Sequence, residues 1–355
     1  MLTLADIYNT LNPYQWIIRI RNKAFDKGFI KSHTFDLPVI CIGNITVGGT
    51  GKTPHTEYLI RLLGSRYKVA VLSRGYGRKS KGFVLGDDRA TMEKIGDEPF
   101  QIKEKFRNVT VAVDEKRVHG ILTLLEKDRP QVILLDDAYQ HRYVKAGLNI
   151  LLVDFNRPIW KDSVLPFGLL RETAKGVERA DIIVVTKCPR DIDKESIEKF
   201  KHQLKNNKNA PVFFSTMQYG EIYAIFPENR KRAELKRGTN VLLVTGIAKP
   251  APLKAELESR GVKVTLMQYS DHHNFTDKEI KEIAETFERC NGEKLIITTE
   301  KDATRLQAHK GMPQSIKENI YAIPIEVDIL ENKKEMFNQK ILDYVTENSR
   351  NSSFS

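Results

Sequence analysis

The sequence predicts an α/β fold in two domains, and two observations carry this prediction. Short apolar runs of strand length alternate with amphipathic stretches of helical length, the order expected of a parallel sheet covered by helices. A polar segment, "KHQLKNNKNAP", then interrupts the series before a second, shorter series begins. With 355 residues, of which 41% are hydrophobic, the chain is long enough to build a core in each domain.

The first series defines the larger domain, which we place at residues 36–211. Helical stretches such as "TPHTEYLIRLLGS" separate its strands, which are apolar along their whole length, so we expect both faces of the sheet to be covered. The strand-like runs lie at 37–43, 67–73, 108–113, 131–137, 149–154 and 181–187.

A connector and a smaller domain follow. The alternating run at 212–226, with Gly220 near its middle, predicts connector strands within 212–228. We assign residues 229–355 to the smaller α/β domain. Its predicted elements are strands at 240–246, 262–269 and 294–300, helices near 250–260 and 276–290, a strand at 319–327 that could return to the connector, and a last helix near 332–347.

The N-terminal segment, residues 1–35, is predicted to be amphipathic and helical. Within it, residues 14–31 mix aromatic and isoleucine side chains with five arginines and lysines. This composition suits a helix on an anionic membrane surface, and equally a helix packed on its own domain. No window approaches the ~18 apolar residues that span a bilayer, and no signal-peptide core is present, so we expect neither export nor a membrane span.

Charge and cysteine content narrow the class of protein. Lys and Arg outnumber Asp and Glu by 57 to 46, a net charge of +11 that attracts phosphates on nucleotides, nucleic acid or lipid. The basic residues are dispersed and no recognition fold is visible, so we expect no nucleic-acid partner. Cys41, Cys188 and Cys290 lack CxxC spacing, which argues against a zinc site or a disulfide framework and fits a reducing cytosol.

The stretch "NITVGGTGKTP" (44–54) predicts a phosphate loop. Gly51, Lys52 and Thr53 supply the end of the G-x-x-x-x-G-K-[ST] pattern, and Thr46 stands where its first Gly belongs. The alternative, a glycine hairpin with a stray lysine, is disfavoured because a strand precedes the stretch and a helix follows it. The larger domain is thus a P-loop nucleotide-binding α/β/α domain. Its expected phosphate-binding residues are Gly48, Gly49, Thr50, Gly51, Lys52 and Thr53.

Further positions favour ATP with Mg²⁺ and narrow the class of nucleotide-binding protein. Asp136 and Asp137 end an apolar strand in the manner of a Walker B motif. "VVTKCP" begins like the guanine-reading [NT]-K-x-D of GTPases, but Pro189 replaces the base-reading Asp, so ATP is preferred over GTP. Partition ATPases carry a second lysine where this chain has Val47, which weakens that partner-switching class.

Other polar clusters, taken one at a time, could have purely structural roles. "LSRGYGRK" (72–79) could be a solvated glycine-rich loop, and "GDEP" (96–99) a turn. "LPFGLLRE" (165–172) ends in an arginine and an acid able to reach phosphates or Mg²⁺. The adjacent His272 and His273 would diverge on regular structure, so capping or packing is expected there rather than a two-histidine metal site.

Together these motifs closely resemble one family, the tetraacyldisaccharide 4'-kinases, which phosphorylate the disaccharide lipid A precursor of Gram-negative bacteria. The matching stretches run in the family's order from Gly43 to Arg305: "GNITVGGTGKTP", "LSRGYGRK", "GDEP", "VDEKRVHG", "DDAYQHR", "LPFGLLRE", "VVTKCP", "TGIAKP", "DHHNF" and "TTEKDATR". The chain departs from the family pattern at Ala138 and Tyr139, where D-D-G-F-Q-H is expected, and at Phe167, where a small residue is expected before Gly168.

The resemblance implies roles for individual residues. Lys52 would contact the β- and γ-phosphates, and Arg171 would stabilise charge on the transferring phosphoryl group. Asp97 would be the general base for the sugar 4'-hydroxyl, and because aspartate is a weak base, His272 would orient it when the two domains close. The metal ligands would come from Thr53, Asp136, Asp137 and Glu172. The substrate-gripping residues would be Asn44, Arg74, Tyr76 and Arg117.

The resemblance also implies partners and a location. The acceptor would be the lipid A disaccharide precursor, and the N-terminal segment would attach the protein peripherally to the anionic cytoplasmic face of the bacterial inner membrane. No obligate protein partner is evident. The alternative hypothesis is a membrane-recruited P-loop ATPase switch, which would bind ATP and phosphorylate no small-molecule acceptor.

Overall fold

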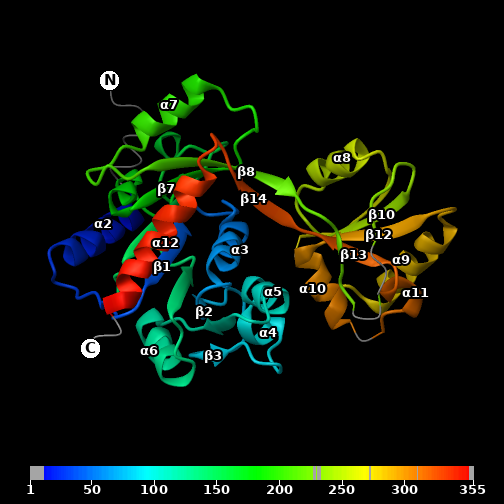
Figure 1. Ribbon diagram of the computed structural model, residues 1–355, viewed down its shortest axis with the longest axis horizontal. Helices are drawn as coiled ribbons and strands as arrows, with labels where there is room; N and C mark the ends of the chain where they lie inside the picture. The colour runs from blue at the N-terminus through cyan, green and yellow to red at the C-terminus, as the bar shows by residue number, and fades with distance from the viewer. Residues whose placement is uncertain (1–11, 227–228, 230–232, 272, 310, 352–355) are drawn as a thin grey trace. The chain divides into compact units, whose positions relative to one another are not determined.

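The computed structural model describes residues 12–226, 229, 233–271, 273–309 and 311–351 (Figure 1). The chain divides into two compact units, one formed by Met1–Met217 with Val327–Ser355 and the other by Gln218–Glu326. Both are α/β units, as the sequence predicts. The smaller unit is therefore inserted into the sequence of the larger one.

The larger unit contains a nine-stranded sheet in the order β14-β8-β7-β6-β1-β5-β2-β4-β3. The strands from β8 to β4 in this order pair in parallel, and β3 runs antiparallel to β4. The strands are β1 (Val39–Asn44), β2 (Val69–Ser73), β3 (Val84–Leu85), β4 (Thr110–Val113), β5 (Val132–Asp136), β6 (Leu148–Asp154), β7 (Ile182–Thr186), β8 (Val212–Tyr219) and β14 (Ile325–Ile329).

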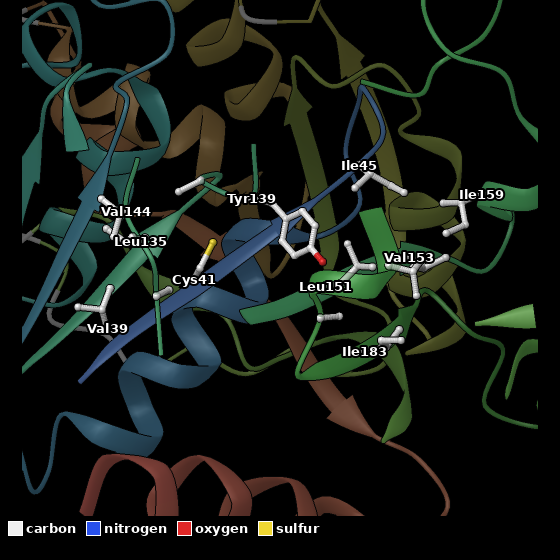
Figure 2. Close-up of a cluster of buried hydrophobic side chains, with 14 of the residues drawn as sticks. Val39, Cys41, Ile45, Leu135, Tyr139, Val144, Leu151, Val153, Ile159 and Ile183 are labelled. Atoms are coloured by element: carbon white, nitrogen blue, oxygen red, sulfur yellow. The ribbon is translucent and has the colours of Figure 1, made fainter. Parts of the chain in front are cut away.

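Both faces of this sheet are buried, which explains the continuous apolar runs. Along β1, Val39 and Cys41 belong to one hydrophobic cluster, whereas Ile40 and Ile42 belong to the other. Figure 2 shows the first cluster, in which side chains from several strands gather around Tyr139. The helices are α2 (Pro13–Asp26), α3 (Lys52–Leu63), α4 (Met92–Ile95), α5 (Asp97–Lys105), α6 (Arg117–Lys127), α7 (Lys194–Gln203) and α12 (Lys334–Asn351), with 3-10 turns at Ile159–Lys161 and Ala174–Arg179.

The last helix corrects the predicted domain boundary, because residues 327–355 belong to the larger unit and not to the smaller domain assigned at 229–355. α12 buries Phe337, Ile341 and Val345 in the second cluster of the larger sheet. The phenol of Tyr58 on α3 donates to Oδ1 of Asn338 at 2.6 Å. Strand β8, predicted as a connector, is likewise a strand of the larger sheet.

The N-terminal helix α2 packs on the larger unit and leaves apolar side chains exposed. Asn12 caps it, since its Oδ1 accepts from the backbone N–H of Gln15 at 3.2 Å while its Nδ2 donates to the carbonyl of Leu165 at 2.8 Å. Phe25 meets Tyr143 edge to face at 5.1 Å. Exposed apolar side chains in and after α2 are Trp16, Ile17, Ile20 and Phe29. Among the described residues, no helix combines the length and apolar character needed to cross a membrane.

The smaller unit has a five-stranded sheet in the order β11-β10-β12-β13-β9, in which only β9 is antiparallel to its neighbour. Its strands are β9 (Tyr223–Ala224), β10 (Asn240–Thr245), β11 (Lys263–Gln268), β12 (Lys294–Thr299) and β13 (Ile320–Ile323). Its helices are α8 (Ala251–Ser259), α9 (Asp277–Arg289), α10 (Glu300–Ala308) and α11 (Gln314–Lys317). A capping box between Thr276 and Glu279 starts α9.

Candidate active site

The predicted phosphate loop connects β1 to α3. Gly48 and Gly51 have φ values of 96° and 86°, a conformation that glycine adopts without steric cost. A Cβ at Gly51 would also collide with Cε of Met217. Because α3 begins at Lys52, its unpaired N–H groups and positive dipole end lie at the loop. The residues from Gly48 to Thr53 thus have the strand, loop and helix arrangement of an anion-binding loop.

Asn44, which we expected to grip the acceptor, is buried beneath this loop. Its side chain is 0% exposed. Nδ2 donates to Oγ1 of Thr50 at 2.7 Å and of Thr46 at 3.4 Å, and the backbone carbonyl accepts from Nε2 of Gln140 at 2.7 Å. The structure corrects the expectation, because this asparagine holds the loop and does not face an incoming sugar.

Asp137 brings two of the predicted catalytic cations together. Nη1 of Arg171 lies 2.9 and 3.1 Å from its two carboxylate oxygens, and Nζ of Lys52 lies 3.6 Å from Oδ1. All three side chains are partly exposed to solvent. Two positive charges against one negative charge leave a net charge of +1 beside the loop, which favours a polyphosphate.

Asp136 lies deeper than its neighbour at the end of β5. Oδ1 accepts from the hydroxyl of Thr56 at 3.1 Å. Burial raises the pKa of the Asp136 carboxyl to about 6, and the adjacent charge of Asp137 acts in the same direction. A cation placed at this carboxylate would lower its pKa again, so the site is suited to receive positive charge.

The donor set fits Mg²⁺ bound together with a nucleotide. The hydroxyl of Thr53 and the carboxylates of Asp136 and Asp137 are the oxygen donors that Mg²⁺ prefers. Within the described part of the chain, no group of three or more His, Cys, Asp or Glu side chains gathers into a metal site. One or two carboxylates completed by substrate phosphates is the usual arrangement for this ion.

Glu172, the remaining metal candidate, is engaged elsewhere. Its side chain is buried. Oε1 accepts from Nη2 of Arg179 at 2.7 Å and Nε2 of Gln140 at 3.0 Å, and Oε2 accepts from Nδ2 of Asn22 at 3.2 Å. Since both oxygens are used by protein donors, this structure supports a structural role that ties α2 to the sheet and gives no support to metal binding.

Arg117, predicted to grip substrate, is only 1% exposed. Its Nη1 donates to the backbone carbonyl of Asp114. Burial lowers the pKa of the Arg117 guanidinium to about 10, although Asp136 and Asp137 act to raise it. It therefore remains cationic at neutral pH, and the structure places its charge near the two aspartates.

The loop after β2 and the start of α5 lie against each other. Arg74 and Tyr76 are exposed, and the phenol-bearing side chain of Tyr76 is 82% exposed. A Cβ on Gly96 would come within 2.9 Å of the Tyr76 carbonyl, so this position requires glycine. Asp97 is the first residue of α5. The predicted base thus lies beside two of the predicted acceptor contacts.

Of the two adjacent histidines, His272 lies outside the described residues. His273 packs within the smaller unit, where it stacks on Tyr269 at 5.0 Å and its Nε2 lies 2.9 Å from Oε2 of Glu279. The backbone N–H of Thr276, and after it this hydrogen bond from His273, lower the pKa of Glu279 to about 2. The expected packing role is what the structure shows for His273.

Comparison with known proteins decides the family. The family model described as "LpxK: Tetraacyldisaccharide-1-P 4'-kinase" matches residues 11–346. The chain belongs to the tetraacyldisaccharide 4'-kinase family. Relatives named tetraacyldisaccharide 4'-kinase include one from Bacteroides thetaiotaomicron, 49% identical across 98% of this chain and 96% of the relative, and one from Phocaeicola vulgatus, 48% identical across 99% of both.

A solved structure agrees with this assignment. A crystal structure described as the "apo" form of LpxK from Aquifex aeolicus in complex with ATP is 31% identical, with a TM-score of 0.73. The match covers 96% of this chain and 98% of that chain. The P-loop fold inferred from the sequence is thereby confirmed.

The departures from the tetraacyldisaccharide 4'-kinase pattern differ in their surroundings. Tyr139 is buried, its hydroxyl donates to the Gly176 carbonyl at 2.8 Å, and Arg179 lies 4.7 Å from its ring centroid. A Cβ at Gly43 would come within 2.7 Å of Cβ of Tyr139, so strand β1 passes close to it. Phe167, in contrast, is 53% exposed on the larger unit.

Sequence reasoning missed a polar group on the other side of the phosphate loop of this kinase. Nζ of Lys187 donates to the Gly49 carbonyl and to Oδ2 of Asp154, the latter at 2.8 Å. Arg157 lies beside Gly48. Asp154 ends an apolar strand just as Asp136 does, and that signal could have marked it. Lys187 was noticed only as part of an incomplete guanine motif.

Proposed function

We propose that this chain transfers the γ-phosphoryl group of ATP to the 4'-hydroxyl of a tetraacylated glucosamine disaccharide 1-phosphate, a step of lipid A biosynthesis. Family membership supports this proposal. The observation that carries it at the level of geometry is the grouping of Lys52, Arg171 and Asp137 beside the phosphate loop.

On the donor side, Lys52 and Arg171 would exchange Asp137 for phosphate oxygens when ATP binds. Both cations are partly exposed, so this exchange requires no opening of a core. Asp137 would then be available, with Thr53 and Asp136, to hold Mg²⁺. When bound, the ion would neutralise negative charge on the phosphates. Arg117 would balance the charge of the two aspartates from the buried side.

On the acceptor side, Asp97 would take the proton of the 4'-hydroxyl as the oxygen attacks. Its position at the start of α5, beside the loop of Arg74 and Tyr76, supports this role. The two exposed side chains would contact the sugar and the 1-phosphate, for which an arginine fork is well suited. The role of His272 as the partner of Asp97 stays a prediction.

Membrane attachment is part of the proposal. The exposed Trp16, Ile17 and Ile20 on α2 and the basic side chains of the same helix would contact the anionic cytoplasmic face of the inner membrane. Replacing Ile17 and Ile20 by Asp should abolish sedimentation with phosphatidylglycerol vesicles while leaving ATP binding intact. Equal sedimentation of the variant and the unaltered chain would refute this attachment.

The decisive experiment is phosphate transfer from ATP to the detergent-dispersed acceptor by the folded chain. The Asp97→Ala variant should bind ATP with unchanged affinity and lose turnover. A membrane-recruited ATPase switch would instead bind ATP, phosphorylate no acceptor and be insensitive to this substitution. The family assignment favours the kinase.

A further inference from the structure

We propose that Lys187 is a positioning residue of the phosphate loop, which it holds together with Asp154 in the conformation that receives ATP. The inference rests on the proposed use of ATP and goes beyond it, because it assigns the loop's shape to residues outside the loop. In this arrangement, side chains from outside the loop hydrogen-bond its carbonyl groups. The N–H groups of Val47 and Thr50 bond the carbonyls of Leu169 and Gly48, and the other N–H groups of the loop would face the anion.

The carbonyl groups at the centre of the loop accept hydrogen bonds from the end of β7. The ammonium of Lys187 donates to the Gly49 carbonyl, and the hydroxyl of Thr186 donates to the Thr50 carbonyl at 2.9 Å. Both donors come from consecutive residues at the end of β7. Two successive loop carbonyls are therefore directed toward β7 and away from the start of α3.

The flanking carbonyls are captured as well. Nη1 of Arg157 lies 3.5 Å from the Val47 carbonyl, and Nδ1 of His55 lies 2.8 Å from the Gly51 carbonyl. Burial lowers the pKa of His55 to about 4, so its ring is neutral at pH 7. Because a carbonyl can only accept, Nδ1 must carry the proton. Charged and neutral donors thus act alike on the loop.

Capture of the carbonyls has an electrostatic reason. A loop that cradles phosphate must present its N–H dipoles to the anion, and any carbonyl turned inward would repel it. Gly48 and Gly51 allow the required backbone conformation but do not enforce it, because glycine is freer than any other residue. Side chains that hold the carbonyls outward supply the missing constraint.

The backbone of Lys187 is itself strained for this purpose. It has a φ of 58°, in the left-handed region that non-glycine residues seldom adopt. The next residue, Cys188, donates its N–H to the Ser215 carbonyl at 3.0 Å, which fixes the turn. A glycine at position 187 would relieve the strain but has no side chain to reach the loop. The hydrogen bond to the loop therefore requires the lysine side chain.

Asp154 orients the lysine. Its carboxylate is 3% exposed, and it also accepts from the backbone N–H of Asn156 at 2.9 Å. Nη2 of Arg157 lies 3.7 Å away, so one buried carboxylate serves two cations that both reach the loop. The lysine amine therefore joins a buried, hydrogen-bonded carboxylate to the carbonyl of Gly49 in the loop. In GTPases a lysine at this place accompanies an Asp that recognises guanine, but Pro189 occupies the place of that Asp here. This chain therefore has the lysine of the motif without the Asp.

The test is Lys187→Met in the full chain, which keeps the aliphatic stem and removes the amine. We expect the Kd for ATP-Mg²⁺, measured by calorimetry, and the KM for ATP to rise on the order of 10-fold or more, because a charge-assisted hydrogen bond is lost. The KM for the acceptor should stay within about twofold. Lys187→Arg should recover part of the ATP affinity, and Lys199→Met, on the exposed face of α7, is the matched control with unchanged values.

A double-mutant cycle with Asp154→Asn should be non-additive, because the second change acts through the same amine. Unchanged ATP affinity in Lys187→Met overturns the inference. The inference is also overturned if Lys187→Met loses affinity equally for ATP and for the acceptor and has a lower Tm in the absence of ATP. That result would indicate a general loss of structure. If the unaltered chain binds no ATP, the proposed function fails first. Should Lys187→Met not fold, Thr186→Val provides the test, with a severalfold rise in the Kd for ATP expected and an unchanged Kd contradicting the inference.

Discussion

The donor side and the acceptor side of the site are built differently. Around the phosphate loop, Asn44 and Thr50 are fully buried and His55 nearly so, and each is hydrogen-bonded to the loop or its neighbours. On the other side, Arg74 is exposed and Tyr76 is 82% exposed. One half of the site is fixed before any ligand arrives, and the other half presents side chains to solvent.

This difference determines which half of the site loses more conformational entropy when its ligand binds. A preorganised loop spends little conformational entropy when ATP binds, whereas exposed side chains lose rotamer freedom when they close on a sugar. We therefore expect substitutions on the donor side to affect catalysis and loop stability together. Substitutions of the exposed acceptor contacts Arg74 and Tyr76 should affect acceptor binding alone.

The largest effect is expected from Arg171→Ala, at the junction of the two halves. Loss of an arginine that stabilises the transferring phosphoryl group should lower kcat by about 10³-fold. The Kd for ATP should change much less, since Lys52 and the loop remain. Steady-state kinetics with Arg171→Lys as the control measure this. A decrease below tenfold would mean that the arginine only neutralises Asp137.

Asn44→Ala should break the preorganised half. The hydroxyls of Thr46 and Thr50 lose a buried partner, which costs about 1–3 kcal/mol of stability. We expect a lower Tm and weaker ATP binding with the KM for the acceptor unaltered, measured by thermal unfolding and calorimetry. A change confined to the acceptor KM would restore our original expectation that Asn44 contacts the sugar.

Tyr76→Ala tests the exposed, acceptor-binding half of the site, where we expect an effect on acceptor binding without a loss of stability. Because the side chain makes little contact with the protein, Tm should hardly change, as for other surface substitutions. The KM for the acceptor should rise severalfold while the Kd for ATP stays constant. Tyr76→Phe separates the hydroxyl from the ring. An altered Tm would show that the loop is more ordered than its exposure indicates.

His55→Gln should give the smallest effect, on the pH dependence of stability. The folded-state pKa of His55 is about 4, below its ordinary value of 6.5, so between these values the unfolded chain binds a proton that the folded chain does not. The stability that depends on a neutral His55 ring is fully present above pH 6.5 and is lost as the pH falls toward 4. The variant should have a shallower slope of Tm against pH in that window. Parallel slopes for the two proteins would contradict a buried neutral imidazole.

Local sequence pattern was sufficient for the elements that carry the site. The runs at 37–43 and 131–137 correspond to β1 and β5, and Lys52 of the predicted phosphate loop lies 3.6 Å from Oδ1 of Asp137, at the end of the Walker B-like run. The motif pattern could not show that Asn44 lies under the loop, because burial depends on packing from other strands. The same limit hid Lys187, whose role depends on a bond to Gly49, distant in sequence.

The predicted end of the smaller domain was wrong for a related reason. Strand β14 and helix α12 look like a continuation of the smaller domain when taken in chain order. Their apolar residues, such as Phe337 and Ile341, pack with strands more than a hundred residues earlier, and periodicity within a window carries no information about such partners.

The return of the chain through β14 has a consequence for how the protein is made. The larger unit completes its hydrophobic core only with α12, which is synthesised after the whole smaller unit. Until then the second cluster of the larger sheet lacks Phe337, Ile341 and Val345. A premature stop between Gln218 and Phe337 would thus damage the nucleotide-binding half, although every residue of the phosphate loop had already been translated.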